Sequence, residues 1–393
     1  MEREYLMMSV PKVIVFGNSH HNTLGLVRSL GEKGIRSILL LEPCDLKFCC
    51  VRFSKYIAKI HYLKTLEDGL RVLREEYWDE KDKPIALNAG DPSMSLLDAH
   101  YGELKEHFHI FNARGEQGLI NYFMDKANQF PIAEKCGLNI IKTWHLNAAK
   151  DLPSDLTYPC LLKGNNSTGS SKADMFICTC REELLSCMHE GVDYLVQEYI
   201  DKDCELDIMG FSWNHGNEVF IPAVVRKVRE TLTRQSDYIR LEPVSDYPAL
   251  SVDAIEAFVR EVGYEGIFSV EMIRRGGKFY FLEMNLRNDG VGWLYTKSGA
   301  NFPYMWVQYC NGDLSRKSLA TAKLRMPLTL MQLWDVLNLK AGKVPFRQWI
   351  KECLGADAHF LFDAKDIKPF LYLIHIFCRQ GMKRALRLLQ LTR

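Results

Sequence analysis

The sequence lacks the extremes of composition that mark several classes of protein. Its 50 lysines and arginines balance 49 aspartates and glutamates, for a formal net charge of +1, which argues against a strongly basic nucleic-acid-binding protein. It has no internal repeat and no low-complexity linker, and its 47% hydrophobic and 25% charged residues are typical of globular chains. A length of 393 residues suggests two or three domains.

Signals for membranes and for disulfide or zinc frameworks are also missing. No apolar run reaches the roughly 20 residues of a spanning helix, and Met1 to Ser9 has no hydrophobic signal region. The 12 cysteines do not form the repeated CxxC pairs of a zinc site. Most stand in apolar stretches, as Cys160 and Cys310 do, and we expect buried thiols. These features predict a protein of the reducing cytoplasm.

The first part of the chain alternates strand-like and helix-like segments. An apolar run ends at Gly17, residues 22–33 have apolar side chains at helical spacing, and a second apolar run follows. This order predicts βαβ units and a small α/β domain. The turn after Gly17 lacks the GxGxxG pattern of dinucleotide-binding folds, and we interpret His20 and His21 as polar loop residues.

The remaining chain has a different pattern of secondary-structure signals. Residues 118–136 have a helical pattern, whereas 195–225 and 267–285 are rich in strand formers. We therefore expect an antiparallel α+β region, followed by a mixed, helix-leaning tail over 313–393.

A β-hairpin is predicted where apolar alternation flanks Arg275-Gly-Gly277. Glu283 and Asn285 are two residues apart on its second strand and therefore share a face. A two-residue loop would send Glu271 to the opposite face. We predict a three-residue loop over 275–277, which pairs residue 271 with 281 and places Glu271 diagonally from Glu283.

This hairpin is a candidate metal site. Two glutamates and an asparagine supply only oxygen ligands, which favour magnesium over zinc. Magnesium usually completes its coordination with phosphate oxygens. The alternative is a solvated sheet face on which the acids are incidental.

Two further segments are candidates for nucleotide binding. The loop Gly164–Ser171 follows a strand-like run ending in Lys163 and contains glycine, serine and threonine but no acid. Backbone N–H groups in such loops form anion sites, although no Walker A motif is present. Residues 195–200 form an apolar run that can pair its backbone with an adenine edge, and Glu205 follows to contact a ribose. An ordinary turn and an ordinary strand are the alternatives.

Taken in order, these segments resemble the ATP-grasp superfamily, and within it the carbamoyl-phosphate-synthase-like and D-aspartate-ligase-like carboxylate–amine ligases. The resemblance runs from about residue 11 to 312. Its most specific element is the Glu283-Met-Asn285-x-Arg287 stretch beyond an upstream strand glutamate. The matching positions are Asp125-Lys126, Lys163 with its loop, Gln197-Glu198-Tyr199-Ile200, Glu205, Glu271 and Glu283 to Arg287.

The resemblance implies an α/β N-terminal pre-ATP-grasp domain followed by a two-part α+β ATP-grasp fold and a helix-leaning C-terminal tail. We expect the pre-ATP-grasp domain at 1–115, the lid with its connecting helix at 116–197, the antiparallel C-terminal domain at 198–312 and the extension at 313–393.

The resemblance also implies roles for individual residues. ATP is implied as the nucleotide, with Mg²⁺, or Mn²⁺ as an alternative. The residues expected to bind ATP are Lys126 and Lys163 at the phosphates, Gly169, Ser170 and Ser171 in the closing loop, Glu198, Tyr199 and Ile200 at adenine, and Glu205 at ribose. The expected metal ligands are Glu271, Glu283 and Asn285. The residues expected to act on the transferred phosphate or the acidic substrate are Arg287, Arg226, Lys227 and Arg229.

The implied reaction activates a carboxylate as an acyl phosphate, which an amine then attacks to form an amide. The stretch after Arg229 runs from Glu230 to Tyr238 and departs from the glycine-rich segment of the D-aspartate-ligase-like members. Substrate identity therefore stays open. Three other classes are carboxylation or phosphorylation by an ATP-grasp enzyme, a nucleotide-binding module without turnover, and a dehydrogenase based on the N-terminal βαβ unit.

The implied partners are a small carboxylate and a small amine, without nucleic acid. Oligomeric state is not indicated by the sequence. The tail has ten mostly apolar residues from Pro369 to Cys378, followed by basic residues without an acid. We favour a helix packed on the protein body. The alternative is contact with an anionic membrane surface, which would suit an enzyme of envelope or capsule precursor synthesis.

Overall fold

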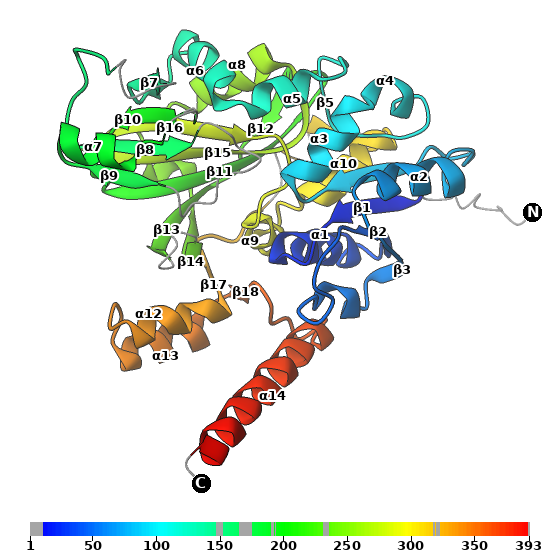
Figure 1. Cartoon of the computed structure of the whole chain (residues 1–393). Coiled ribbons are helices and arrows are strands. Elements are labelled where there is room, and N and C mark those ends of the chain that lie inside the picture. Colours follow the sequence, from blue (N-terminus) through cyan, green and yellow to red (C-terminus); the bar gives the residue numbers. More distant parts are fainter. Residues whose placement is uncertain are drawn as a thin grey trace, which may run out of the picture. The chain divides into compact units, whose positions relative to one another are not determined.

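The chain divides into two compact units, each of which is described by itself. Unit 1 comprises Met1–Gly118, Arg287–Leu324 and Ala358–Arg393, and unit 2 comprises Leu119–Leu286 and Arg325–Asp357. The C-terminal tail therefore contributes to both units. The computed structural model (Figure 1) describes residues 11–146, 152–164, 175–189, 192, 194–230, 236–316, 319 and 323–391.

Unit 1 is built on a four-stranded parallel sheet of order β3-β2-β1-β4. This arrangement confirms the predicted βαβ units. Its strands are β1 (Val13–Gly17), β2 (Ser37–Leu41), β3 (Ile57–Tyr62) and β4 (Ile85–Asn88), with the short β5 (Asn112–Ala113) and β18 (Ala358–His359) elsewhere in the unit. Its helices are α1 (His21–Gly31), α2 (Glu67–Glu76), α3 (Asp91–Ala99), α4 (Tyr101–Leu104), α9 (Gly292–Ser298), α10 (Phe302–Cys310), α14 (Lys368–Leu391) and the 3₁₀ turn η1 (Val51–Phe53).

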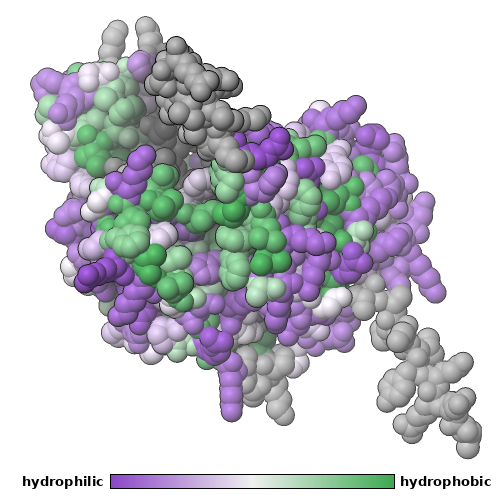
Figure 2. All heavy atoms as spheres, turned by 90° about the horizontal axis from the view of Figure 1, so that it is seen from below, coloured by the Kyte–Doolittle hydropathy of each residue, from purple (hydrophilic) through white to green (hydrophobic). Residues whose placement is uncertain are grey.

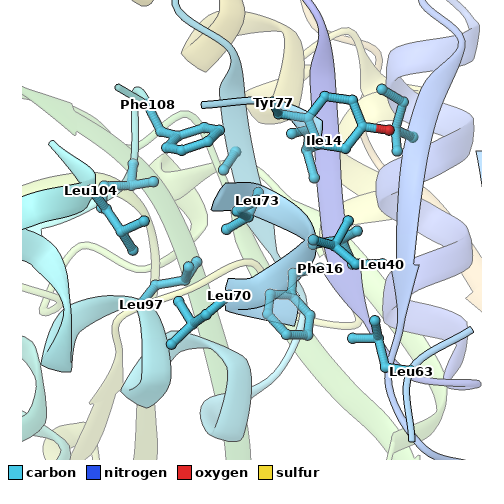
Figure 3. Packing of buried hydrophobic residues seen from close by; sticks show 14 of the residues in the cluster. Ile14, Phe16, Leu40, Leu63, Leu70, Leu73, Tyr77, Leu97, Leu104 and Phe108 are labelled. Atoms are coloured by element: carbon cyan, nitrogen blue, oxygen red, sulfur yellow. The ribbon is translucent and has the colours of Figure 1, made fainter. Parts of the chain in front are cut away.

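A hydrophobic core lies between this sheet and its helices. Phe16 and Leu40 of the sheet pack with Leu70 and Leu73 of α2 and Leu97 of α3 (Figure 3). Strands β1 and β2 are buried along their whole length, as is usual for parallel strands covered on both faces. Continuous apolar runs, rather than alternation, therefore predict these strands.

The start of α14 packs within unit 1. Leu373 and Ile376 are buried, and the Tyr372 ring lies 4.2 Å from that of Phe53. Just before the helix, Asp366 accepts a hydrogen bond of 3.1 Å from the buried Arg28. The described side chains of α14, up to residue 380, thus include buried apolar ones. None of the helices in the described residues is long and apolar enough to cross a membrane.

Unit 2 contains two sheets. The large one runs β17-β14-β13-β11-β15-β16-β6, with β12 beside β11, and is antiparallel except for the β16–β6 pair; the small one runs β7-β10-β8-β9. The strands are β6 (Asn139–Ile140), β7 (Thr143–Leu146), β8 (Cys160–Gly164), β9 (Phe176–Cys178), β10 (Tyr194–Glu198), β11 (Cys204–Trp213), β12 (Glu218–Phe220), β13 (Val224–Glu230), β14 (Ser236–Glu242), β15 (Tyr264–Arg275), β16 (Lys278–Asn285) and β17 (Leu328–Met331). The helices are α5 (Leu119–Met124), α6 (Lys126–Lys135), α7 (Arg181–Cys187), α8 (Val252–Val262), α12 (Val336–Lys340), α13 (Phe346–Gly355) and the 3₁₀ turns η3 (Val244–Asp246) and η4 (Leu333–Asp335).

The structure corrects two predictions at this level. The helical pattern over 118–136 is two helices, because Asp125 ends α5 and caps α6 by accepting a hydrogen bond of 2.9 Å from the backbone N–H of Ala127. All the cysteines are free thiols, but only Cys49, Cys50, Cys160 and Cys178 are buried. Apolar neighbours in the chain do not decide which face of an element a side chain occupies.

Some apolar side chains remain on the surface. Helix α13 has no buried residue, and Phe346 and Leu354 are 63% and 82% exposed. Figure 2 shows groups of hydrophobic residues among hydrophilic ones on the face that it presents. Exposed apolar side chains are common in folded proteins.

Candidate functional site

The β15–β16 hairpin has a tighter turn than the sequence suggested. Arg275 pairs with Lys278, so the loop has two residues, Gly276 and Gly277, with φ values of 55° and 83°. The predicted pairing of residue 271 with 281 is therefore wrong. Two-residue turns with both φ values positive match the twist of the flanking strands, and consecutive glycines adopt them without steric cost.

A β-bulge then restores the shared face. Met272 pairs with Phe281, but Glu271 pairs with Glu283, which leaves Leu282 as the extra residue. Glu271 thus lies directly opposite Glu283 rather than diagonally from it. Directly paired residues have Cβ atoms about 5 Å apart. The two residues are accordingly closer along the ladder than in the predicted diagonal arrangement.

Asn285 belongs to the same group. It pairs with Ser269, and its Nδ2 atom lies 3.4 Å from Glu271 Oε1. The predicted ligands Glu271, Glu283 and Asn285 are therefore neighbours on one face. Among the described residues no group of three or more His, Cys, Asp or Glu side chains is arranged to hold a metal ion. Two carboxylates and an amide fit a magnesium ion whose remaining ligands are water and nucleotide oxygens.

Lys126 reaches this face from the start of α6. Its Nζ lies 2.8 Å from Glu283 Oε2. Asp125 caps the helix, and the side-chain amide of Gln129 bonds both the N–H and the C=O of Met284, at 2.7 and 3.0 Å. This clamp fixes the first turn of α6 beside the residue that follows Glu283.

Lys163 lies near the same charges from the small sheet. It pairs with Leu195 in the β8–β10 ladder. Burial lowers the pKa of Lys163 to about 8, with a further decrease from Lys126, while Glu283 opposes the shift. A phosphate that binds beside Lys163 would stabilise the charged form of this lysine, because a nearby anion offsets the effect of burial.

Sequence reasoning missed Asp207. It pairs with Glu271 across β11 and β15 and is 2% exposed. Because Glu205 and Asp207 are two residues apart on one strand, they share a face. That spacing was the available signal, since Glu205 was already a candidate.

Lys227 lies among these acids. Its Nζ forms an ion pair with Glu205 and lies 3.8 Å from Glu271. Although burial disfavours its charge, Glu271, Glu205 and Asp207 raise the pKa of Lys227. Burial in turn raises the pKa of Glu205, but Lys227 and Lys202 outweigh it and lower that pKa below its ordinary value. Both carboxylate oxygens of Glu205, the expected ribose ligand, are therefore held by lysines here.

The other expected residues lie in several places. Glu198 ends β10 and is exposed, and Tyr199 and Ile200 follow it half-buried. The backbone N–H of Tyr199 donates to Pro159 O at 3.1 Å. Gly169, Ser170 and Ser171 lie outside the described residues.

The two arginines of β13 are engaged away from Glu271. Arg226 makes two hydrogen bonds of 3.1 Å to Glu242. Arg229 makes bonds of 2.7 and 2.6 Å to Asp335 and one of 2.9 Å to Glu352. These acids lie outside the segments in which the sequence indicated chemistry. Arg287 belongs to unit 1, where its Nε and Nη2 atoms lie 2.5 and 3.0 Å from the two carboxylate oxygens of Asp91.

Comparison with known proteins supports the fold. No family model matches the sequence. The arginine-specific large chain of carbamoyl phosphate synthase from Geobacillus stearothermophilus is 22% identical over 180 residues, which are 43% of this chain and 17% of that one. The chain thus matches only a small part of that relative's length.

Solved structures match over most of the chain. An L-amino acid ligase from Bacillus licheniformis superposes with a TM-score of 0.62 at 16% identity, covering 81% of this chain and 78% of the ligase. The biotin carboxylase domain of the Hydrogenobacter thermophilus 2-oxoglutarate carboxylase, solved with MgADP and bicarbonate, gives a TM-score of 0.60 at 15% identity, covering 81% and 73%. These proteins share the fold that the order of motifs indicated, and the chain has the ATP-grasp fold.

Proposed function

We propose that the protein is an ATP-dependent carboxylate–amine ligase that forms an amide through an acyl phosphate. The observation that carries this proposal is the direct pairing of Glu271 with Glu283, with Asn285 beside them and Lys126 on Glu283. Acids paired across a sheet repel unless cations lie between them. Magnesium supplies a cation for the paired acids, and the triphosphate of ATP supplies anions for the magnesium and for Lys126.

In this proposal the substrate carboxylate attacks the γ-phosphorus of ATP. The bond to the bridging oxygen breaks, ADP leaves with its electron pair, and the acyl phosphate remains. Lys126 and Lys163 hold the phosphate oxygens and stabilise their charge in the transition state. Glu271, Glu283 and Asn285 would hold magnesium, which would neutralise the charge of the same phosphate oxygens.

The neutral amine then attacks the acyl carbon, the bond from that carbon to the phosphate oxygen breaks, and phosphate leaves with the electron pair. The nitrogen loses one proton to the departing phosphate or to water, and an amide forms. Lys227 keeps Glu271 and Glu205 in place through its ion pairs. Arg226 and Arg229 hold the sheet through Glu242 and Asp335. Glu198, Tyr199 and Ile200 line adenine in the proposal, and Gly169, Ser170 and Ser171 close over the phosphates.

The test is ADP release with and without Mg²⁺ across a matrix of carboxylates and amines. The proposal expects release that needs both co-substrates and the metal. Hydroxylamine in place of the amine should trap the acyl phosphate as a hydroxamate. If ADP is released but no carboxylate yields a hydroxamate, the ligase assignment is wrong.

Carboxylation is the second candidate, because the similar H. thermophilus domain was solved with bicarbonate. It predicts ADP release that depends on bicarbonate with one co-substrate alone. The sequence has no Met-Lys-Met biotin attachment motif. We expect a cytoplasmic enzyme of small-molecule metabolism, and a place in envelope precursor synthesis remains a hypothesis for the same substrate panel.

A further inference from the structure

Helices α12 and α13 of unit 2 attach to the large sheet through polar side chains. Asp335, which directly precedes α12, is fully buried and accepts hydrogen bonds of 2.7 and 2.6 Å from Arg229 of β13. Asn338 of α12 is also buried and donates to Asp237 of β14 at 2.8 Å. Glu352 of α13 accepts a bond of 2.9 Å from the same Arg229. Polar groups therefore occupy the positions at which both helices contact these strands.

The apolar side chains of this segment are turned to solvent instead. A surface helix normally buries its apolar stripe against the core. In α12 and α13, both of which the structure describes along their whole length, the buried residue is the polar Asn338 of α12. The exposed apolar side chains are Trp334, Val336, Leu337, Phe346 and Leu354. Attachment to the sheet gives no reason for apolar residues at these positions.

The exposed charges of the same segment are all positive. From Leu333 to Gly355 the exposed ionisable side chains are Lys340, Lys343, Arg347 and Lys351. The two acids of the segment, Asp335 and Glu352, are both bound by Arg229. The formal net charge of the whole chain is only +1, so this group of cations is a local feature and does not reflect a basic protein.

Apolar and basic side chains lie next to one another on α13. Phe346 and Leu354 are eight residues apart and Arg347 and Lys351 are four apart, and residues at such spacings follow one side of a helix. Lys351 precedes Leu354 by three residues, so the two are neighbours on the helix surface. We call the exposed apolar and basic side chains of residues 334–354 the outer face.

Charge decides among the surfaces that could cover the outer face. A second copy that paired through the same face would place its cations against those of the first, because such a contact joins identical patches, and like charges repel. An occupant must therefore supply negative charge together with an apolar layer. A membrane surface with anionic lipids has both, and helices with Lys and Arg beside Trp, Phe and Leu lie in such surfaces.

We propose that the outer face of α12 and α13 docks on an anionic lipid surface, with its apolar side chains at the headgroup boundary and its cations at the lipid phosphates. The inference does not depend on the proposed function, and it concerns unit 2 alone. It places membrane contact on a segment that precedes the C-terminal tail, which was the alternative that the sequence suggested. Such docking is reversible, because it depends on shallow insertion and on charge.

The first test is co-sedimentation of the full-length protein with lipid vesicles at low salt. The wild type should bind vesicles of equal parts phosphatidylcholine and phosphatidylglycerol at least about tenfold more tightly than vesicles of phosphatidylcholine alone. R347Q/K351Q should weaken binding to the anionic vesicles by at least about tenfold. The control R71Q/R74Q removes exposed arginines of α2, changes the net charge equally, and should bind as the wild type does. Binding to neither kind of vesicle, equal binding to both, or equal losses in the two variants would overturn the proposal.

The second test locates the contact. Leu354 is 82% exposed, so L354E should keep the thermal midpoint of the wild type. It should bind the anionic vesicles at least about tenfold more weakly, because a carboxylate resists insertion beside anionic headgroups. The control L371E changes a leucine of α14 that is 53% exposed and should bind as the wild type does.

Two results of the second test would refute the proposal. Loss of binding in L371E but not in L354E would assign the contact to the C-terminal tail. A wild-type dimer that L354E dissociates, measured by analytical ultracentrifugation without lipid, would identify the outer face as an interface between copies of this chain.

Discussion

Strand β13 contributes a basic residue to each of two charge clusters in unit 2, and the clusters differ in kind. Lys227 lies with Glu205 and Glu271 in the first. Arg229 lies with Asp335 and Glu352 in the second. Both combine a cation with several acids, so charge and residue type alone do not separate them.

Lys227 is itself more buried than Arg229, at 5% against 11% exposed, so the two clusters differ in their extent and in their geometry. The first continues to Glu283 and Lys126, whose side chains are 22% and 29% exposed, and its lysine is a point charge with adaptable donors. In the second, Asp335 is fully buried and is held bidentately by Arg229. The amide of Asn338 also bonds Asp237 and Asp335 there. An open cluster can exchange partners with a ligand, whereas a closed one fixes the fold.

The largest expected effect is on catalysis in the open cluster. Glu283→Gln should lower kcat/KM on the order of a thousandfold, because in the proposed function it removes a carboxylate that holds magnesium, and with it several kcal/mol of transition-state stabilisation. The thermal midpoint should stay close to that of the wild type. Steady-state ADP release measures the first and a melting curve the second. E261Q is the matched control, since Glu261 also pairs with a lysine, at 3.2 Å, and it should keep full activity.

The next effect is on stability in the closed cluster. Arg229→Met should lower the free energy of unfolding by about 3 kcal/mol, because it leaves Asp335 buried without its cation. Urea unfolding at neutral pH measures the difference. R226M removes a more exposed arginine, 31% exposed and paired with Glu242, and should cost about 1 kcal/mol or less. Equal losses in both variants would contradict the distinction.

The smallest effect is a pH dependence in the closed cluster. Burial and the adjacent Asp335 raise the pKa of Asp237 to about 7, while Arg229, Asn338 and Lys343 oppose the shift. Between its ordinary pKa and about 7 the folded state holds a proton that the unfolded state has lost. The wild type should therefore lose up to about 1.4 kcal/mol of stability per pH unit as pH rises through this window.

D237N removes this titration. Its free energy of unfolding, from urea titrations at several pH values between 4.5 and 7.5, should vary less with pH than that of the wild type. Parallel curves for the two proteins would show that Asp237 titrates normally.

The β15–β16 hairpin shows how far sequence pattern reaches. Alternation and the two glycines predicted the strands and the turn, and the shared face of Glu271 and Glu283 was confirmed by the register. The predicted loop length was wrong, and so was the pairing. Leu282 bulges out of the ladder, and no local pattern marks a bulge, because its cost is compensated by packing across neighbouring strands.

The arginines of β13 show where sequence pattern stops. The motif grouped Arg226, Lys227 and Arg229, but alternation and a bulge after Lys227 separate their partners. Asp335 and Glu352, which hold Arg229, come from a segment about a hundred residues later. A contact of that separation has no periodic signal, so sequence alone could not remove Arg229 from the candidates.

By itself the sequence determined most of the local elements and, through the order of its motifs, the ATP-grasp fold, because hydrophobic periodicity and turn residues act over a few positions. Only the tertiary structure decided which charges meet. It paired Lys227 with Glu271, enclosed Arg229 among acids and joined Asp91 to Arg287. Electrostatic partners are selected by distance in space and by burial, and neither is encoded in spacing along the chain.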